Sequence, residues 1–232
     1  MVEGLQLSSI ASIGRNFDEY YRLFALADID PAVENILDVA AGASSFCAEA
    51  HQLGYSVTAT DRIYNESHGH IEQLCNRDLD RILQQVPANA GMYDWTYFSD
   101  IQALERQRRR TCELFLEDFR RFGASRYLPV AYPATPFPDK AFSIALSAGF
   151  LFLYDALLDY QFHQQVILEL ARITTREIRI WPLVNLQGQR PAVFDQLLAD
   201  QSLRHLHFHT RPIDYAFFKN ADEVLIIDLA VE

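Results

Sequence analysis

Short apolar runs, separated by turns and helical patterns, recur along this chain. Residues 35–40 (NILDVA) form an apolar run around one aspartate, and residues 55–60 (YSVTAT) are rich in β-branched side chains. Such runs predict strands buried on both faces, as in a parallel sheet. Between them, Ser44 or Ser45 can cap a helix over 46–53. The pattern therefore predicts one βαβ unit of ordinary length.

The rest of the chain continues this alternation of strands and helices. An amphipathic pattern predicts a helix over 17–27, and a second one predicts a helix over 159–173. Further strands are predicted over 126–131, 142–147, 177–181, 205–210 and 224–229. The last two are close together along the chain, which is compatible with antiparallel pairing.

Between the second and third predicted strands, residues 62–126 are more polar and follow a helical pattern, with helices expected near 77–85 and over 98–122. We interpret this segment as an insertion within a single domain spanning residues 1–232. It follows the second strand directly, so it is expected at the carboxyl ends of the strands, where open α/β sheets bind ligands. It is therefore a candidate lid.

Composition narrows the class of protein. The 232 residues suit one domain with an insertion, and 50% of them are hydrophobic, as in a packed globular chain. The formal net charge of −11 disfavours nucleic acid as a partner, because phosphate backbones select basic surfaces. The first ten residues do not resemble a secretory signal, and no apolar run is long enough to cross a membrane. Three scattered cysteines do not form a disulfide framework, so we expect a soluble cytoplasmic protein.

The turn after the first strand carries the first candidate chemistry. It reads Ala40-Ala41-Gly42-Ala43-Ser44, and its small side chains would let a ligand approach the backbone closely. Asp61 follows Gly42 by 19 positions, close to the ~20 expected for an acidic residue that binds ribose hydroxyls. Nicotinamide-binding domains use the same device, so this pair alone does not identify the ligand.

Three motifs together identify the class of ligand better than the Gly42 and Asp61 pair does. They are ILDVAAGASSF at 36–46, VTATD at 57–61 and TPFPDKAFSIALSAGFLFLY at 135–154. With them, most of the chain outside the insertion resembles the class I S-adenosylmethionine-dependent methyltransferases. The resemblance implies a Rossmann-like α/β fold, with a doubly wound, mostly parallel seven-stranded sheet, and S-adenosylmethionine as cofactor. The third motif has no counterpart in a nicotinamide-binding domain.

The resemblance also implies roles for individual residues. Asp38 and the turn 40–44 would face the methionine part of the cofactor, and Asp61 would bind the ribose. Arg22, on the helix before the first strand, would be the ion-pair partner of the cofactor carboxylate. The implied cofactor-binding set is Arg22, Asp38, Ala40, Gly42, Ser44, Asp61, Arg62, Ser147 and Ala148.

Within this set, Ser147 and Ala148 would line the methyl-transfer face at the end of the fourth strand. The chain departs from the family pattern at three positions. Ala40 and Ser44 replace two glycines of the usual turn, and Ala131 stands where an acidic residue commonly accepts a hydrogen bond from the adenine amino group.

These observations favour a methyltransferase that acts on a small-molecule acceptor. A non-catalytic cofactor-binding or scaffolding protein of the same fold is the alternative, and a nicotinamide-dependent oxidoreductase is a weaker third. If the acceptor needs a base, the candidates are Asp94, Tyr154, Asp155 and His163. The alternating histidines at 205, 207 and 209 are too far apart on a strand to converge on one zinc ion, so no metal site is expected.

Overall fold

The computed structural model describes residues 4–215 and 217–229, and its centre is a seven-stranded sheet. The sheet has the order β3-β2-β1-β4-β5-β7-β6, in which the first five strands run parallel and the last two pair antiparallel. This is the Rossmann-like methyltransferase fold that the motifs predict. The strands are β1 (Asn35–Val39), β2 (Ser56–Thr60), β3 (Tyr127–Leu128), β4 (Phe142–Ala148), β5 (Thr174–Trp181), β6 (His207–Pro212) and β7 (Glu223–Asp228).

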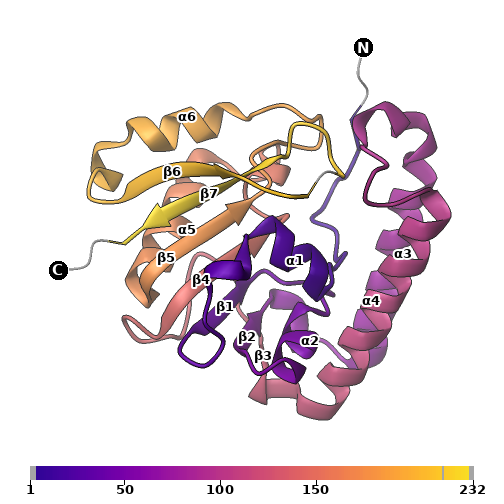
Figure 1. The fold of residues 1–232 in the computed structure, drawn as a ribbon, viewed down its shortest axis with the longest axis horizontal. Helices are drawn as coiled ribbons and strands as arrows, with labels where there is room; N and C mark the ends of the chain where they lie inside the picture. Colours follow the sequence, from indigo (N-terminus) through magenta and orange to yellow (C-terminus); the bar gives the residue numbers. More distant parts are fainter. Residues whose placement is uncertain (1–3, 216, 230–232) are drawn as a thin grey trace.

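Helices cover both faces of the sheet (Figure 1). They are α1 (Phe17–Leu23), α2 (Phe46–Gln52), α3 (His68–Gln85), α4 (Ile101–Phe122), α5 (Tyr160–Ile173) and α6 (Ala192–Ala199). One apolar core joins α1, α2 and the two long helices to the sheet, and a second joins α5 and α6 to the opposite face. Alternate residues of one strand therefore enter different cores, as Ile36 and Leu37 of β1 do.

Two predicted elements end early for local reasons. The helix predicted over 17–27 ends at Leu23, and Ala25 takes a left-handed conformation (φ 48°) that cannot continue a helix. The strand predicted over 126–131 shortens to Tyr127–Leu128, because Pro129 follows and has no N–H to give to a ladder. Helix α6 was not predicted.

The segment 62–126 contains α3 and α4, which run antiparallel to one another as a long pair beside the sheet (Figure 1). Asp100 caps α4 by accepting from the amide of Ala103 at 2.7 Å, and Ser67 caps α3. Leu104 and Phe115 of α4 belong to the same core as β1 and β2. No described helix is long and apolar enough to cross a membrane.

The chain before α1 is an extended segment, residues 4–16, which we call the N-terminal strap. It descends between the sheet and the pair α3 and α4 (Figure 1). The amide of Ser12 donates to Asp78 of α3 at 3.0 Å, and the amide of Ala11 donates to the hydroxyl of Tyr154 at 3.0 Å. The strap therefore crosses the carboxyl ends of the central strands, where the predicted site lies.

Candidate functional site

A cavity of about 220 Å³ opens at the carboxyl ends of β1, β2 and β4, beneath the strap. We call it the cofactor cavity. Its lining comprises Ile10, Ala11, Ser12, Ile13, Arg15, Tyr20, Ala40, Ala41, Gly42, Asp61, Arg62, Val130, Ala131, Tyr132, Ala148, Gly149, Phe150, Leu158 and Phe162. Five of the nine predicted cofactor residues, Ala40, Gly42, Asp61, Arg62 and Ala148, line this one space.

Gly42 and Asp61 are joined directly. The amide of Gly42 donates to Oδ2 of Asp61 at 2.9 Å, and the amide of Ile63 donates to Oδ1 at 3.0 Å. Gly42 itself has a φ of +57°, a left-handed conformation in which glycine is unstrained. Burial raises the pKa of Asp61, whereas these amide donors lower it. The carboxylate is thus held in a fixed orientation at the end of β2.

Asp38 lies below the cavity and does not line it. It is completely buried, and its Oδ1 accepts from the hydroxyl of Tyr20 at 2.9 Å, while Oδ2 has no partner among the described residues. Burial raises its pKa to about 8, against the opposing effect of the Tyr20 hydrogen bond. Tyr20 does line the cavity, so Asp38 supports the wall instead of touching a ligand.

Ser44 also has a supporting position. Its hydroxyl donates to the backbone carbonyl of Arg15 at 2.7 Å, and the amide of Ser45 donates to the same carbonyl at 3.1 Å. A Cβ placed on Gly14 would lie 2.0 Å from the carbonyl oxygen of Ala43, which is possible only for glycine. The turn after β1 therefore packs directly against the backbone of the strap.

Arg15 is thereby brought to the centre of the site. Its guanidinium lies 4.8 Å from the centroid of the Trp181 ring, and a Cβ on Gly149 would be 2.9 Å from Nη1. Its Nε is buried without a described hydrogen-bond partner, and the guanidinium lies near enough to Glu19 to lower the pKa of that carboxyl. Such a cation at a cavity wall is a ready partner for an anionic ligand group.

Arg22, the residue predicted for that role, points elsewhere. It lies on the outer side of α1, pairs with Asp18 at 3.0 Å and Asp214 at 3.4 Å, and does not line the cofactor cavity. Tyr20, two positions earlier on the same helix, faces inward. The structure therefore does not bring Arg22 to the predicted site.

The end of β4 contributes one of its two predicted residues. Ala148 lines the cofactor cavity, whereas Ser147 is completely buried and its hydroxyl has no described partner. Successive strand residues point to opposite faces, so the two cannot both line one cavity by their side chains. Arg62 lines the cavity beside Asp61, at the start of the short helix that Asp61 caps.

The far wall is formed by Val130, Ala131 and Tyr132. The Tyr132 hydroxyl is 2.7 Å from the hydroxyl of Thr60, which also donates to the carbonyl of Asp38 at 2.9 Å. These contacts fix an aromatic ring opposite the end of β2. Position 131, where the family commonly has an acidic side chain, is therefore part of a wall with apolar and aromatic surface.

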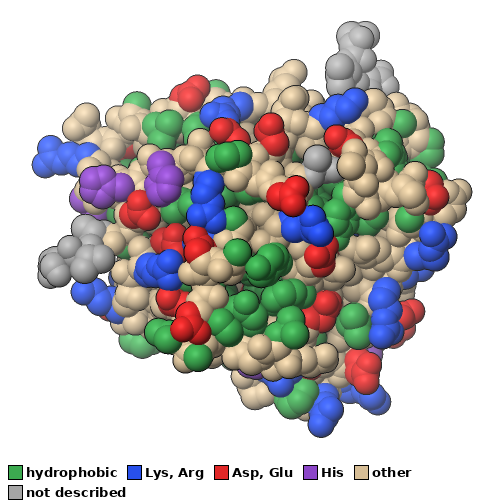
Figure 2. Space-filling model, in the orientation of Figure 1, with side chains coloured by type: hydrophobic (Ala, Val, Ile, Leu, Met, Phe, Trp, Pro, Cys, Tyr) green, Lys and Arg blue, Asp and Glu red, His purple; other side chains and the backbone are tan. Residues whose placement is uncertain are grey.

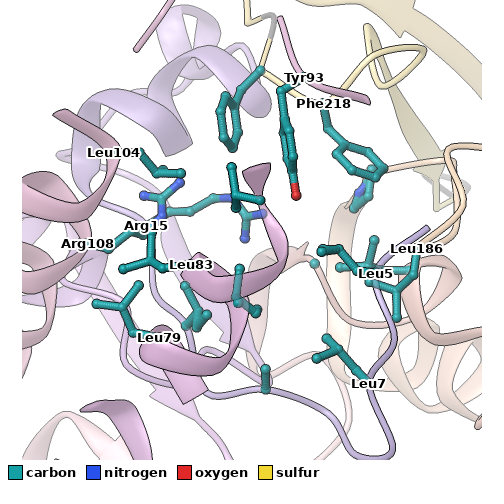
Figure 3. Close-up of a pocket in the computed structure, with 18 of the residues that line it drawn as sticks. Leu5, Leu7, Arg15, Leu79, Leu83, Tyr93, Leu104, Arg108, Leu186 and Phe218 are labelled. Carbon is teal, nitrogen blue, oxygen red and sulfur yellow. The ribbon is translucent and has the colours of Figure 1, made fainter. Parts of the chain in front are cut away.

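A second cavity, of about 110 Å³, adjoins the first and shares Ala11, Ile13, Arg15 and Gly149 with it. We call it the acceptor cavity. Leu79 and Leu83 of α3 lie on one side and Leu186 on the other, while Tyr93 points its hydroxyl toward the middle (Figure 3). The candidate lid segment 62–126 therefore supplies part of its wall.

Of the four candidate bases, only Tyr154 lines the acceptor cavity. Asp94 is partly exposed and accepts from Thr96, which lowers its pKa. Asp155 accepts from Asn185 at 3.1 Å, and His163 is completely buried against Phe152. These three line neither cavity.

The sequence interpretation missed Arg15 and Gly149. Both are ordinary by local pattern, and only the path of the strap over the sheet brings them together. The available signal was the pair Gly14-Arg15 just before the Asn16 cap of α1, where a glycine allows close approach and a cation follows.

No model of a known protein family matches the chain. The chain is 40% identical over 227 residues to the uncharacterized protein MJ0045 of Methanocaldococcus jannaschii, covering 96% of this chain and 98% of that protein.

Two solved structures are similar in fold at low identity. The crystal structure of magnesium protoporphyrin IX methyltransferase from Synechocystis PCC 6803 with bound SAH is 11% identical, covers 92% of this chain and 81% of that chain, and has a TM-score of 0.50. A TehB-like SAM-dependent methyltransferase from Corynebacterium glutamicum is 11% identical over 90% of this chain and 86% of that chain, with a TM-score of 0.48. The chain therefore belongs to one family with MJ0045 of Methanocaldococcus jannaschii, and its fold is that of the class I S-adenosylmethionine-dependent methyltransferases.

Proposed function

We propose that this protein is an S-adenosylmethionine-dependent methyltransferase that acts on a small molecule. One observation carries the proposal. Asp61, Gly42, Ala148 and Arg15 line a single cavity at the carboxyl ends of the central strands. A carboxylate, an open backbone turn and a cation are the groups that a ribose, a methionine chain and a carboxylate require.

The residues present fit this cofactor. Each oxygen of Asp61 accepts one backbone amide, which leaves lone pairs for the two ribose hydroxyls. The buried Nε of Arg15 has no partner, and a carboxylate in the cavity would supply one. The wall formed by Val130, Ala131 and Tyr132 offers apolar surface for an adenine ring. We assign the carboxylate role to Arg15 in place of Arg22.

When bound, the cofactor supplies a methyl group on a positively charged sulfur, a good leaving group. The protein's task is then to hold the acceptor in line and to exclude water. The strap and the walls from α3 and α4 enclose the acceptor cavity for that purpose. Since Arg15 and Gly149 line both cavities, they mark the place where donor and acceptor would meet.

Fold similarity adds support, because the Synechocystis structure with the same fold holds SAH. A small acceptor suits the second cavity, whose volume is about 110 Å³. It also suits the surface, where acidic and basic side chains are interspersed on the face that Figure 2 shows, instead of gathering into a basic patch for nucleic acid. We also propose a cytoplasmic location, because Cys47, Cys75 and Cys112 are free thiols, as a reducing compartment favours.

A thermal-shift panel with S-adenosylmethionine, S-adenosylhomocysteine, NAD⁺ and NADPH tests the proposal. Ligands that bind the folded state raise the melting temperature, by roughly 5 °C or more when present at ~100 times their Kd. We expect the two adenosyl-sulfur compounds alone to do so. Stabilisation by a nicotinamide nucleotide only would favour an oxidoreductase, and stabilisation by none of the four would favour the non-catalytic scaffold.

A further inference from the structure

The wall of the acceptor cavity is predominantly apolar. Aliphatic side chains come from the strap, α3, α4 and the loop after β5, and aromatic rings come from the loops around residues 93 and 217 (Figure 3). The aliphatic ones include Leu5, Leu83, Leu104 and Leu186. A ligand that fills this space must be apolar over most of its surface.

One of the two arginines in the wall is already neutralised. Arg108 binds Glu19 through two contacts of 2.5 and 2.7 Å, and Tyr215 donates to the same carboxylate at 2.6 Å. Burial alone would raise the pKa of Glu19, but the Arg108 guanidinium holds it below its ordinary value. Glu19 is therefore an anion paired with Arg108, and Arg15 lies near enough to lower the pKa of Glu19 as well, while its own Nε has no described hydrogen-bond partner.

The lining also lacks a group that could remove a proton at neutral pH. Its titratable side chains are Arg15, Arg108, Tyr93 and Tyr154, with no carboxylate or imidazole among the described lining residues. Burial raises the pKa of Tyr93 to about 12 and raises that of Tyr154 as well. Neither phenol can then serve as a base, because a base must be deprotonated near the working pH.

We propose, building on the function proposed above, that the acceptor is an apolar small molecule whose nucleophile is already an anion in neutral solution, a carboxylate. A lone pair of a carboxylate oxygen forms the bond to the methyl carbon. The bond from the methyl carbon to the sulfonium breaks, and its electron pair stays on the cofactor sulfur, which becomes a neutral thioether. No proton has to leave in this step, so the missing base is not needed.

The charge at the cavity wall suits such an acceptor. Arg15 lines both cavities, and its guanidinium has five N–H donors, of which the cofactor carboxylate takes two at most, so the others remain for the carboxylate of the acceptor. An alcohol would reach this place fully protonated, and an amine would reach it as a cation. Both would need a base, and the amine would also meet a like charge.

A matched series of eight-carbon compounds tests the inference: octanoate, octanol and octylamine. Each is incubated with the protein and S-adenosylmethionine labelled in the methyl group, and the labelled product is extracted and measured. We expect turnover of octanoate, and rates about 100-fold or more lower for octanol and octylamine. The octanoate rate should stay level from about pH 6 to about pH 8, because a carboxyl group is fully ionised over that range.

Binding is measured separately by the change in tryptophan emission, since the Trp181 ring lines the acceptor cavity. The variant Leu83→Gln should weaken binding of the octyl compounds, whereas Leu198→Gln, at an exposed position on α6, should not. Methylation of octanol or octylamine at the rate of octanoate would overturn the proposal. So would binding of octanoate without turnover, and so would a failure of octanoate to bind cofactor-loaded protein. A protein that binds no cofactor would instead overturn the function proposed above.

Discussion

The backbone amide of Gly42 donates to Oδ2 of Asp61 at 2.9 Å, which ties the turn after β1 to the end of β2. The two residues are 19 positions apart and belong to neighbouring parallel strands. This bond positions the carboxylate before any ligand arrives. A site whose acidic group is already oriented loses little entropy on binding.

Asp61 should dominate the affinity for the ribose. Replacing it in Asp61→Ala removes charge-assisted hydrogen bonds, and we expect binding of S-adenosylmethionine to weaken by about 1.5–3 kcal/mol. Calorimetric titration measures this loss. Asp195→Ala, in the first turn of α6 and outside both cavity linings, is the matched control and should bind as the wild type does. Unchanged affinity in Asp61→Ala would refute the ribose role.

Arg15 should recognise the carboxylate of the cofactor. We expect Arg15→Met to bind S-adenosylmethionine about 10-fold or more weakly and to lose discrimination against decarboxylated S-adenosylmethionine. Arg22→Met removes an equal charge from the outer side of α1 and should leave both affinities unchanged. If Arg22→Met lost the discrimination and Arg15→Met kept it, the assignment made from the sequence would be correct after all.

The strap should be needed for the cofactor cavity. A Cβ on Gly14 would meet the backbone of Ala43 at 2.0 Å, so Gly14→Ala must lift the strap from the turn. We expect a stability loss of about 1–3 kcal/mol and weaker cofactor binding. Gly69→Ala, in the first turn of α3 with open space around it, is the control and should be neutral or slightly stabilising. Equal behaviour of the two variants in denaturant unfolding would contradict the role of the strap.

Asp38 should make stability depend on pH. Its pKa rises from the ordinary 3.8 to about 8, chiefly because it is buried. Between these values the unfolded chain releases a proton that the folded protein retains, so the contribution of Asp38 to stability falls as pH rises and is constant above about 8. Asp38→Asn cannot ionise and can still accept from Tyr20.

The difference in unfolding free energy between Asp38→Asn and the wild type should therefore shift in favour of the variant between about pH 5 and pH 8, by about 1 kcal/mol or more. Urea unfolding at both pH values measures it. A difference that does not change with pH would mean that Asp38 has an ordinary pKa.

Replacing only one member of the Arg108–Glu19 pair should strongly destabilise the folded protein. Both side chains are buried, with 6% and 0% of their surfaces exposed. Arg108→Met would leave the Glu19 charge without its main partner, and we expect a loss of about 3–5 kcal/mol. The double variant with Glu19→Gln should recover part of that loss. If the double variant were less stable than Arg108→Met, the two residues would not form a coupled pair.

Much of the fold could be predicted because its signals are local. The strands β1, β2 and β4 each follow from an apolar or β-branched run of adjacent residues. The last two strands lie close together along the chain, which is compatible with the antiparallel pairing of β6 and β7 that the structure has. The early end of α1 depends on a backbone conformation at Ala25 that no propensity scale favours.

The site was predictable where one turn defines it and not where distant segments meet. Ala40, Gly42, Asp61, Arg62 and Ala148 share a cavity because parallel strands end at one edge. Whether Arg15 or Arg22 faces that cavity depends on the path of the strap and on the rotation of α1. Those are set by tertiary packing, which spacing along the chain does not encode.

Calorimetric titration of the purified, cofactor-free protein with S-adenosylmethionine and S-adenosylhomocysteine tests the central claim most directly. The arrangement of Asp61, Gly42 and Arg15 predicts that both bind at one site per chain with a Kd of about 1–100 μM, a binding free energy of about 5–8 kcal/mol. No binding of either compound at ~1 mM by correctly folded protein would contradict the claim that this cavity holds the methyl donor.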